Sequence, residues 1–387
     1  MLKTREYKLK YLTEKITKGT TPSNIGETFT DEGIMYFRSE LIGKTKYVDK
    51  SSGLLYISES THEKLKRSQI KENDMLFSMA GIYLGKISLV SSSDIPANTN
   101  QAVAIIRFNS SNIDLNYVYY YMTQKWYNSY INSLTAQAAQ PNINLEQIGK
   151  LKLYLPDIKI QNKIAKIISR YDEAIENNNK RIKLLEQMAQ NLYKEWFVRF
   201  RFPGYENCEF ENGIPVGWNV EKVKNLVKRL PFGKTYKKQE LSNIGKIIVI
   251  DQSEDEVLGY HDDVPSHKAS FDEPVALFGD HSCKYVLMTE DFSLGENIIP
   301  YLGNNIDLYY LYYSVYKIIQ TEEYKRHWNL FINKKILVPI EEFQLKFRNQ
   351  LIPILSTIQK LKKQNMNLSQ QRDLLLPRLM SGKLEVN

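Results

Sequence analysis

The chain has 387 residues, of which 42% are hydrophobic and 25% charged, and its formal net charge is +8. The length predicts two or more domains, and the composition excludes a disordered or membrane-spanning class and is typical of a soluble globular protein. The start MLKTREYKLKYL lacks the apolar core of a signal peptide, and only two cysteines, Cys208 and Cys283, are present. Both features predict a cytoplasmic protein without a disulfide scaffold.

The positive charge is concentrated in two segments. Residues 159–201 hold 10 Lys/Arg and 5 Asp/Glu, and residues 341–383 hold 8 and 3, so each segment has a net charge of +5. Subtracting these ten charges from +8 leaves the rest of the chain at about −2. The basic balance favours a polyanionic partner. Because the remaining domain-sized stretches are nearly neutral, polar side chains would have to do much of any base reading.

The first half of the chain consists of a mixed domain and a long helix. Residues 1–155 contain short β-like runs, among them GIMYFRSELI, DMLFSM, LGKISLV and AVAIIRF, separated by polar loops. The segment DLNYVYYYMTQKWYNSYINSL then predicts one amphipathic helix. A seven-residue apolar repeat predicts a long helix over 156–200, and the Pro- and Gly-rich stretch 201–217 predicts a linker.

The second half repeats this scheme. Residues 218–338 contain GKIIVI, PVALFG and KYVLM, followed by NNIDLYYLYYSVYKIIQ, which resembles SNIDLNYVYYYM of the first half. Residues 339–387 carry a second heptad pattern and a C-terminal tail, and Pro156 and Gln161 recur 183 positions later as Pro339 and Gln344. The chain is therefore predicted to have an α+β fold, a tandem duplication of an α/β domain followed by a long helix.

The two heptad seams predict that the long helices pair as an antiparallel coiled coil. An Asn178–Asn365 pair would set the register, and the guanidinium of Arg372 would lie on the ring of Tyr171. The residues expected at the seam are Ile168, Tyr171, Ile175, Asn178, Ile182, Leu185, Ala189, Ile354, Ile358, Leu361, Asn365, Leu368, Arg372 and Leu375. Pro353 is expected to kink or begin the second helix, and Pro377 to end it. The alternative is that each helix packs only on its own domain.

Catalytic motifs are absent from the sequence. We find no P-loop or G-x-G-x-x-G spacing, and no Asn-Pro-Pro-aromatic stretch. His281 and Cys283 share a loop with Asp280, but no second pair at metal-ligand spacing accompanies them, and nothing nearby would orient a base. We therefore expect no catalytic residue and no metal site, and the sequence favours a binding protein over an enzyme.

Several distinctive segments follow one another along the chain: KGTTPS with YFRSELI, NDMLFSMAGIYLGKISLV, ANTNQAVAIIRF, AQPNINLEQIGKLKLYLPDIKIQNKIAKII, GIPVGW and QRDLLLPRLMSGKLEV. In order, spacing and duplication they resemble the specificity subunit of type I restriction-modification systems over nearly the whole chain. The domain at 218–338 departs most from the first.

The resemblance implies two target recognition domains, 1–155 and 218–338, each reading one half of a split, asymmetric double-stranded DNA site. It implies that the helices act as spacers and dock two methylation subunits, which carry the adenine-methylating site and S-adenosylmethionine, with a motor-nuclease subunit as a further partner. This chain would hold no cofactor and perform no reaction. The alternatives are a free-standing DNA-binding protein or a structural dumbbell scaffold joining other proteins. A helix of about 40 residues spans roughly 60 Å, which limits the half-site centres to about 18 base pairs apart.

Candidate DNA contacts are polar loop residues, because Asn, Gln, Arg and Lys read base edges while Lys, Arg, Ser and Thr bind phosphates. In the first domain they are Lys18, Thr20, Thr21, Ser23, Asn24, Arg38, Ser39, Asn98, Asn100, Gln101, Gln137, Gln140 and Asn142. In the second they are Lys234, Thr235, Tyr236, Lys237, Lys238, His281, Ser282, Lys284, Arg326, His327 and Asn329. A single polar loop residue is more often merely solvated. Trp196 and Phe197, at the end of the first helix, are either core or docking surface, and we favour docking.

Overall fold

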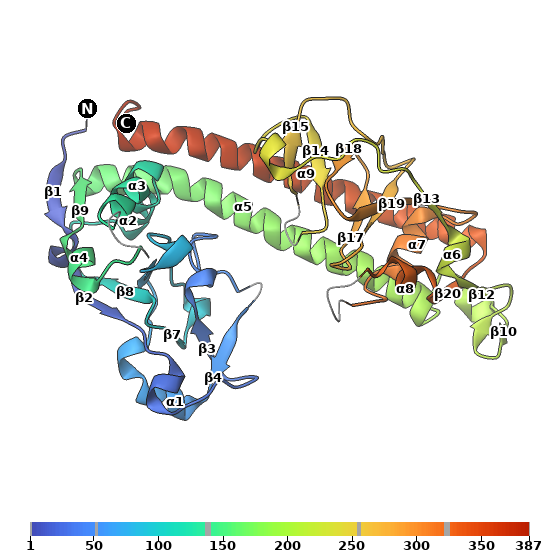
Figure 1. The fold of residues 1–387 in the computed structure, drawn as a ribbon, viewed down its shortest axis with the longest axis horizontal. Helices are drawn as coiled ribbons and strands as arrows, with labels where there is room; N and C mark the ends of the chain where they lie inside the picture. The colour runs from blue at the N-terminus through green and yellow to red at the C-terminus, as the bar shows by residue number, and fades with distance from the viewer. Residues whose placement is uncertain (1, 51–52, 136–140, 254–256, 321–325, 387) are drawn as a thin grey trace. The chain divides into compact units, whose positions relative to one another are not determined.

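The computed structural model describes residues 2–50, 53–135, 141–253, 257–320 and 326–386. The chain divides into two compact units, one formed by Met1–Asn177 with Gln364–Asn387 and the other by Asn178–Lys363. The division falls inside both long helices, α5 (Ile158–Tyr193) and α9 (Glu341–Met380) (Figure 1). Each unit therefore holds one α/β domain and a segment of each long helix.

Unit 1 contains a four-stranded antiparallel sheet of order β2-β8-β5-β6, a three-stranded sheet of order β4-β3-β7, and the pair β1-β9. Within the three-stranded sheet, β3 pairs with β4 antiparallel and with β7 parallel. The strands are β1 (Arg5–Lys8), β2 (Thr13–Lys18), β3 (Ile34–Phe37), β4 (Leu55–Ile57), β5 (Met75–Ser78), β6 (Ile87–Leu89), β7 (Ala97–Thr99), β8 (Val103–Phe108) and β9 (Lys152–Leu155). The helices of the domain are α1 (Glu59–Lys64), α2 (Leu115–Met122), α3 (Lys125–Ser133) and α4 (Leu145–Lys150).

Unit 2 repeats the same sheets in the same order. Its four-stranded sheet has the order β13-β19-β16-β17, its three-stranded sheet the order β15-β14-β18, and β12 pairs with β20. The strands are β12 (Asn219–Lys222), β13 (Val227–Arg229), β14 (Ile247–Ile250), β15 (Gly259–His261), β16 (Val275–Gly279), β17 (Tyr285–Met288), β18 (Phe292–Leu294), β19 (Ile298–Gly303) and β20 (Lys335–Val338). The short helices are α6 (Val223–Leu226), α7 (Leu308–Val315) and α8 (Trp328–Ile332). The predicted tandem duplication is confirmed.

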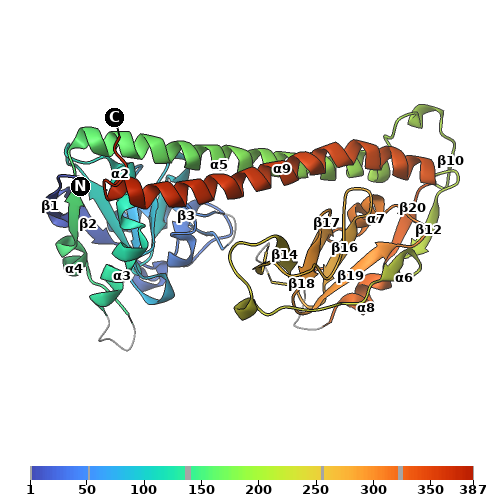
Figure 2. The same ribbon diagram turned by 90° about the horizontal axis from the view of Figure 1, so that it is seen from above.

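The central strands are apolar on both faces because both faces are covered. All four residues of β5 and all five residues of β16 are buried. In unit 2, α7 packs between the sheet and the long-helix segments (Figure 2). Leu308 and Leu311 of α7 belong to the core with the sheet, whereas Tyr309 and Tyr310 belong to the core with α9. A helix buried on opposite sides reads as apolar all round, which explains the run LYYLYYSV.

Gln161 joins the start of α5 to the start of α2 in unit 1. Its Oε1 accepts a hydrogen bond from the Asp114 backbone N–H at 3.1 Å, and its Nε2 donates to the carbonyl oxygens of Pro156 and Asn112, both at 2.9 Å. Only 1% of Gln161 is exposed. Asp114 in turn caps α2. The buried amide thus satisfies backbone groups that the helix ends would otherwise leave without partners.

Gln344 makes the corresponding connection in unit 2. Its Oε1 accepts from the Asp307 N–H at 2.8 Å, and its Nε2 donates to the Pro339 carbonyl oxygen at 2.8 Å. Asp307 caps α7 as Asp114 caps α2. The recurrence of Pro and Gln five positions apart therefore has a physical reason, because the amide returns to the carbonyl that precedes its own helix.

In each unit the segments of α5 and α9 pack against one another. In unit 1, Ile164 and Ile168 share a core with Leu376 and Leu379. In unit 2, one core contains the predicted seam residues Ile182, Ala189, Ile354, Ile358 and Leu361, with Leu185 half-buried against it. Leu375 is half-buried against the core of unit 1, and Ile175 and Leu368 are half-buried as well. The segments run antiparallel, since rising numbers along α5 meet falling numbers along α9.

The polar members of the predicted seam behave differently. The contacts of the described residues include no stacking of Arg372 on the ring of Tyr171. Arg372 instead forms an ion pair at 2.7 Å with Asp172, the residue that follows Tyr171. The guanidinium binds the carboxylate rather than the ring because a charge-assisted hydrogen bond is stronger than a cation–π contact at a half-exposed site. Asn178 is buried. It falls in unit 2 and Asn365 in unit 1, so their pairing stays a prediction.

α9 neither begins at Pro353 nor ends at Pro377, so these two expectations were wrong, while a kink at Pro353 stays a prediction. α9 runs without interruption from Glu341 to Met380, through both Pro353 and Pro377. A proline removes one intrahelical hydrogen bond, but a helix of 40 residues held by a packed apolar face tolerates that loss. Near Pro353, the hydroxyl of Thr357 donates to the proline's carbonyl oxygen at 2.8 Å.

Two further boundaries differ from the predictions. The single helix expected over DLNYVYYYMTQKWYNSYINSL is two helices, α2 and α3, because Gln124 is extended and the side chains of Thr123 and Gln124 both donate to the Tyr120 carbonyl oxygen. The expected linker 201–217 contains a hairpin of β10 (Phe210–Glu211) and β11 (Ile214–Pro215). Its turn residues Asn212 and Gly213 both have positive φ, which is typical of a tight hairpin turn.

Candidate functional site

In unit 1, three loops meet at the edge of the four-stranded sheet where β2 and β5 end and β8 begins. Lys18 at the end of β2 pairs with Ala104 of β8, and Ser78 at the end of β5 pairs with Val103. The loop after β2 then turns tightly over β7. At Gly19 a Cβ atom would lie 1.9 Å from the carbonyl oxygen of Thr99, so that only glycine fits there.

Backbone hydrogen bonds join these loops to a fourth segment that leads into α4. Met79 donates its N–H to the Ala102 carbonyl oxygen at 2.8 Å, and Ile143 donates to the Met79 carbonyl oxygen at 2.9 Å. Ala80 and Asn142 form an isolated antiparallel bridge. The loops are therefore fixed to the sheet, and polar side chains on them are held in defined places.

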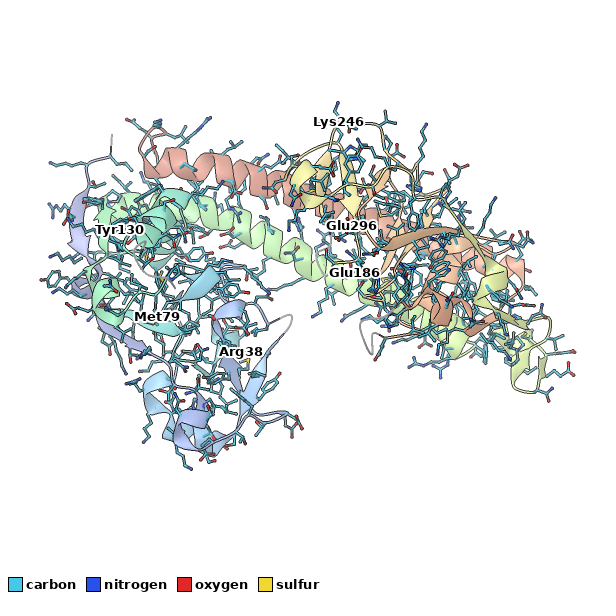
Figure 3. All side chains as sticks on the ribbon, in the orientation of Figure 1. Arg38, Met79, Tyr130, Glu186, Lys246 and Glu296 are labelled. Carbon is cyan, nitrogen blue, oxygen red and sulfur yellow. The ribbon has the colours of Figure 1, made fainter. Side chains whose placement is uncertain are left out.

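A cleft of about 480 Å³ opens between these loops, near Met79 in Figure 3. It is lined by Lys18, Met79, Ala80, Gln101, Ala102, Asn142, Ile143, Asn144 and Gln147. Three of these, Lys18, Gln101 and Asn142, are predicted DNA contacts from three different loops. The cleft thus offers one ammonium group and several amides, the groups that bind phosphate oxygens and base edges.

Asn144 and Gln147 are lining residues that the sequence analysis missed. They form a capping box at the start of α4, in which Asn144 Oδ1 accepts from the Gln147 N–H at 2.8 Å and Gln147 Oε1 accepts from the Asn144 N–H at 2.9 Å. Capping uses the side-chain oxygens, and the amide NH₂ groups take no part in it. The signal was present in the sequence NINLEQ, where an Asn is followed three residues later by Gln.

Asn98 is not a DNA contact but part of the core of the first domain. It is fully buried in β7, and its Nδ2 donates to the Leu65 carbonyl oxygen at 3.2 Å and to Ser68 Oγ at 3.0 Å, while its Oδ1 contacts His62 Nδ1. Every polar atom of the side chain is used internally. The prediction failed because the loop motif ANTNQ begins inside a strand.

The other predicted residues of the first domain differ in their exposure to solvent. Ser23 and Asn24 are exposed in the turn Pro22–Ile25, whereas Thr20, Thr21, Ser39 and Asn100 are half-buried. Thr21 Oγ1 contacts Gln101 Oε1, and Arg38 forms an ion pair with Glu40 at 2.8 Å. Gln137 and Gln140 lie outside the described residues.

In unit 2, the corresponding edge is formed where β13 and β16 end and β19 begins. The loop after β13 carries Lys234 and Thr235, both exposed, and the loop after β16 carries Asp280 to Lys284. The segment before β19 contains Glu296, labelled in Figure 3, and Asn297, whose carbonyl oxygen accepts from the Asp280 N–H at 2.9 Å. This segment was not predicted because its sequence, SLGENI, has little similarity to NTNQAV of the first domain.

Tyr236 supports its loop from within. It is buried, it stacks on the His261 ring with centroids 4.2 Å apart, and its hydroxyl donates to Asp263 at 3.2 Å. Lys234 Nζ donates to the same carboxylate at 3.0 Å, and this hydrogen bond holds the pKa of Asp263 below its usual range. The predicted contact by Tyr236 was therefore wrong, whereas Lys237 and Lys238 next to it are exposed.

His327 was also wrongly predicted as a DNA contact. It is buried, and its Nδ1 lies 3.1 Å from the carbonyl oxygen of Asp280. The Asp280 carboxylate accepts from the N–H groups of His327 and Trp328 at the start of α8. Arg326 and Asn329 are exposed, as is Ser282, while His281 and Lys284 are half-buried.

The aromatic end of α5 is core and not an open docking surface, against our expectation. Trp196 and Phe197 are buried in a π-helical turn that follows α5, Lys194–Val198. The ring centroids of Phe197 and Phe347 lie 5.2 Å apart, and those of Phe197 and Tyr310 4.7 Å apart. Burial raises the pKa of nearby Tyr193 to about 12.

Within the described ranges, no three His, Cys, Asp or Glu side chains are grouped so that they could hold a metal ion. The same residues include no helix with the length and apolar character needed to cross a bilayer.

The chain is similar to known proteins over most of its length. Residues 2–187 match the model of the type I restriction modification DNA specificity domain. The chain is 23% identical to the type I restriction enzyme MjaIX specificity subunit of Methanocaldococcus jannaschii, with 96% of this chain and 91% of that protein aligned. It is 28% identical to the MjaVIII specificity subunit of the same organism over 47% of this chain and 42% of that protein.

A solved structure has the same fold. The crystal structure of a type I restriction-modification S subunit from M. genitalium superimposes with a TM-score of 0.58 at 16% identity, covering 98% of this chain and 96% of that one. The matched domain model, the aligned length and the duplicated architecture agree with one another: residues 2–187 match a type I restriction modification DNA specificity domain, and the chain as a whole is similar to type I specificity subunits in sequence and in fold.

Proposed function

We propose that this chain is the DNA-recognition subunit of a type I restriction-modification complex, in which each unit's α/β domain reads one half of a split, asymmetric DNA site. The observation that carries this proposal is the repetition of one sheet order in two units, with polar loops at the same edge of each sheet. Because the loops differ in sequence between the units, the two half-sites would differ too.

The chemistry of the cleft in unit 1 fits base reading at low net charge. In unit 1, Gln101 and Asn142 present amides beside the ammonium group of Lys18. An amide pairs with the N6 and N7 edge of adenine, whereas a lysine binds guanine or a phosphate. Since the domains are nearly neutral, we infer that these few polar contacts supply specificity and that the basic helices and the partner subunits supply much of the affinity.

We infer that this chain performs no reaction itself and that two methylation subunits, which hold S-adenosylmethionine, dock on α5 and α9, with a motor-nuclease subunit as a further partner. Support for docking comes from apolar side chains that the helices leave exposed. Leu184 and Met188 of α5 are 64% and 57% exposed and lie four residues apart, on one face of the helix. We also infer that the complex works in the cytoplasm.

Sequencing of methylated adenines in the host, with and without the gene for this chain, tests the proposal. The expected result is a methylated motif of two unlike half-sites that disappears when the gene is deleted and returns with a plasmid copy. An unchanged set of methylated positions would refute the proposal. If the chain binds a specific sequence but forms no complex with a co-expressed methylation subunit, it is a free-standing DNA-binding protein instead. If random DNA is bound without dependence on salt concentration or not at all, a scaffold is favoured.

A further inference from the structure

Two large apolar side chains stand out by their exposure. Ile82 is 86% exposed and Val264 is 84% exposed, more than any other large hydrophobic residue among those described. One lies in each unit. An isolated exposed apolar residue is common on protein surfaces and needs no explanation by itself. The positions of these two, beside the polar loops of the recognition domains, are what call for one.

Ile82 lies on a turn that is fixed to the cleft of unit 1. The two residues at the start of the turn, Met79 and Ala80, line that cleft. Gly81 donates its N–H to the Pro141 carbonyl oxygen at 3.1 Å, and Gly85, at the end of the turn, donates to the Ser78 carbonyl oxygen at 2.9 Å. The turn is therefore held at both ends, and Ile82 is presented to solvent next to the amides of the cleft.

Val264 is held in the same manner beside the loop that carries Lys234. The carboxylate of the preceding residue, Asp263, accepts from Lys234 Nζ at 3.0 Å. The hydroxyl of Ser266, two residues after Val264, donates to the Lys234 carbonyl oxygen at 2.6 Å. Asp263 and Ser266, on either side of Val264 in the sequence, are thus tied to the exposed polar loop, and the valine side chain is presented alongside it.

We propose, on the basis of the proposed function, that Ile82 and Val264 each contact the 5-methyl group of a thymine in the half-site read by their own domain. The major groove offers hydrogen-bonding groups and one apolar group, the thymine methyl. A reading surface that combines amides and a lysine with one fixed aliphatic side chain matches that set of groups. The contact would remove both apolar groups from water and would distinguish thymine from cytosine at one position.

The test is a thermodynamic cycle between protein and DNA. The full-length chain, in complex with its methylation subunits, is titrated with duplexes that carry the methylated site, in which each thymine of one half-site is replaced in turn by deoxyuridine. Removal of one buried methyl group is worth a factor of about four in the dissociation constant. We expect one position in the first half-site where the wild-type complex loses about fourfold affinity and where the Ile82→Ala complex shows no difference between thymine and uracil.

The second half-site provides an internal control. Val264→Ala should remove the thymine dependence of one position there and leave the first half-site unaffected, while Ile82→Ala should do the reverse. Tyr11→Ala, which truncates an apolar side chain that is 70% exposed and does not line the cleft, should leave every thymine-to-uracil ratio unchanged. An equal loss on thymine and uracil duplexes, or no position with coupling, overturns the proposal. Failure of the wild-type complex to prefer its methylated site would instead refute the proposed function.

Discussion

Replacement of Gln161 by Leu tests whether the buried amide is what joins α5 to the first domain. The side chain is 1% exposed and serves three backbone groups, the N–H of Asp114 and the carbonyl oxygens of Pro156 and Asn112. Leu is similar in size but has no polar atom, so all three groups lose their partner. At about 1 kcal/mol for each hydrogen bond lost, Gln161→Leu should lower the free energy of unfolding by about 3 kcal/mol.

Gln344→Leu provides a second measurement of the same effect in unit 2. Gln344 serves two backbone groups, the N–H of Asp307 and the carbonyl oxygen of Pro339, so the expected loss is about 2 kcal/mol. Gln161→Glu separates the accepted hydrogen bond from the two donated ones. A carboxylate still accepts from the Asp114 N–H, but it cannot donate to the two carbonyl oxygens and repels them. Its loss should be at least as large as that of Gln161→Leu.

Urea unfolding of the full chain, followed by circular dichroism, gives the stability of each variant, and hydrogen exchange assigns the loss to a unit. Peptides that contain Asp114 should lose protection in Gln161→Leu, and peptides that contain Asp307 should lose it in Gln344→Leu. Gln350→Leu, at an exposed position of α9, is the matched control and should change stability by less than about 0.5 kcal/mol. If both buried variants unfold within that margin of the wild type, the amides do not hold the helix ends in place.

Three further predictions concern the helices and the cleft. Asp172→Ala should lower the free energy of unfolding by about 1–3 kcal/mol in urea, because it removes the more buried of the two carboxylates that pair with Arg372, the other being Asp373. Asp172→Ala combined with Arg372→Met should recover part of that loss, and equal stability of all forms contradicts this reasoning. Gln101→Ala should weaken DNA binding by about 1–3 kcal/mol and relax one base position in the methylated motif. Asn98→Ala should lower the melting temperature and leave the motif unchanged. The opposite pair of results would contradict the assignment of the cleft as the DNA-reading site. One helical turn inserted into both α5 and α9 at the unit boundary should lengthen the spacer between half-sites by one or two base pairs, and an unchanged spacer in methylation sequencing would refute the helices as a ruler.

Duplication and helix pairing were predictable because they depend on patterns that extend over many residues. The heptad positions of Ile182 and Leu361 and the repeated Pro–Gln spacing are periodic, so single exceptions do not hide them. The two prolines misled the prediction because local propensity was weighed without the packed apolar face of α9, which outweighs it. The register contact at Arg372 was off by one residue because a carboxylate lay next to the expected ring.

The site was less predictable, because the residue type at a loop position does not reveal whether the side chain points toward solvent or into the domain. Asn98 and His327 were predicted to be exposed, but both are buried and make hydrogen bonds inside the domain. Gln101 and Asn142, which lie in similar local sequences, line the cleft. Asn144 and Gln147 line the cleft from the start of α4, where the sequence analysis predicted no helix. Burial of a polar side chain depends on partners distant in sequence, and no local pattern supplies those.

The composition of unit 1 has a consequence for how the chain is made. Its hydrophobic core joins Ile164 and Ile168 to Leu376 and Leu379, which are translated about 200 residues later. At a synthesis rate of 5–20 residues per second, roughly 10–40 s pass between the synthesis of the apolar face of α5 and that of the α9 segment that packs on it. The domain that begins first is therefore completed last, and a nascent chain stalled before Gln364 leaves that face open to water.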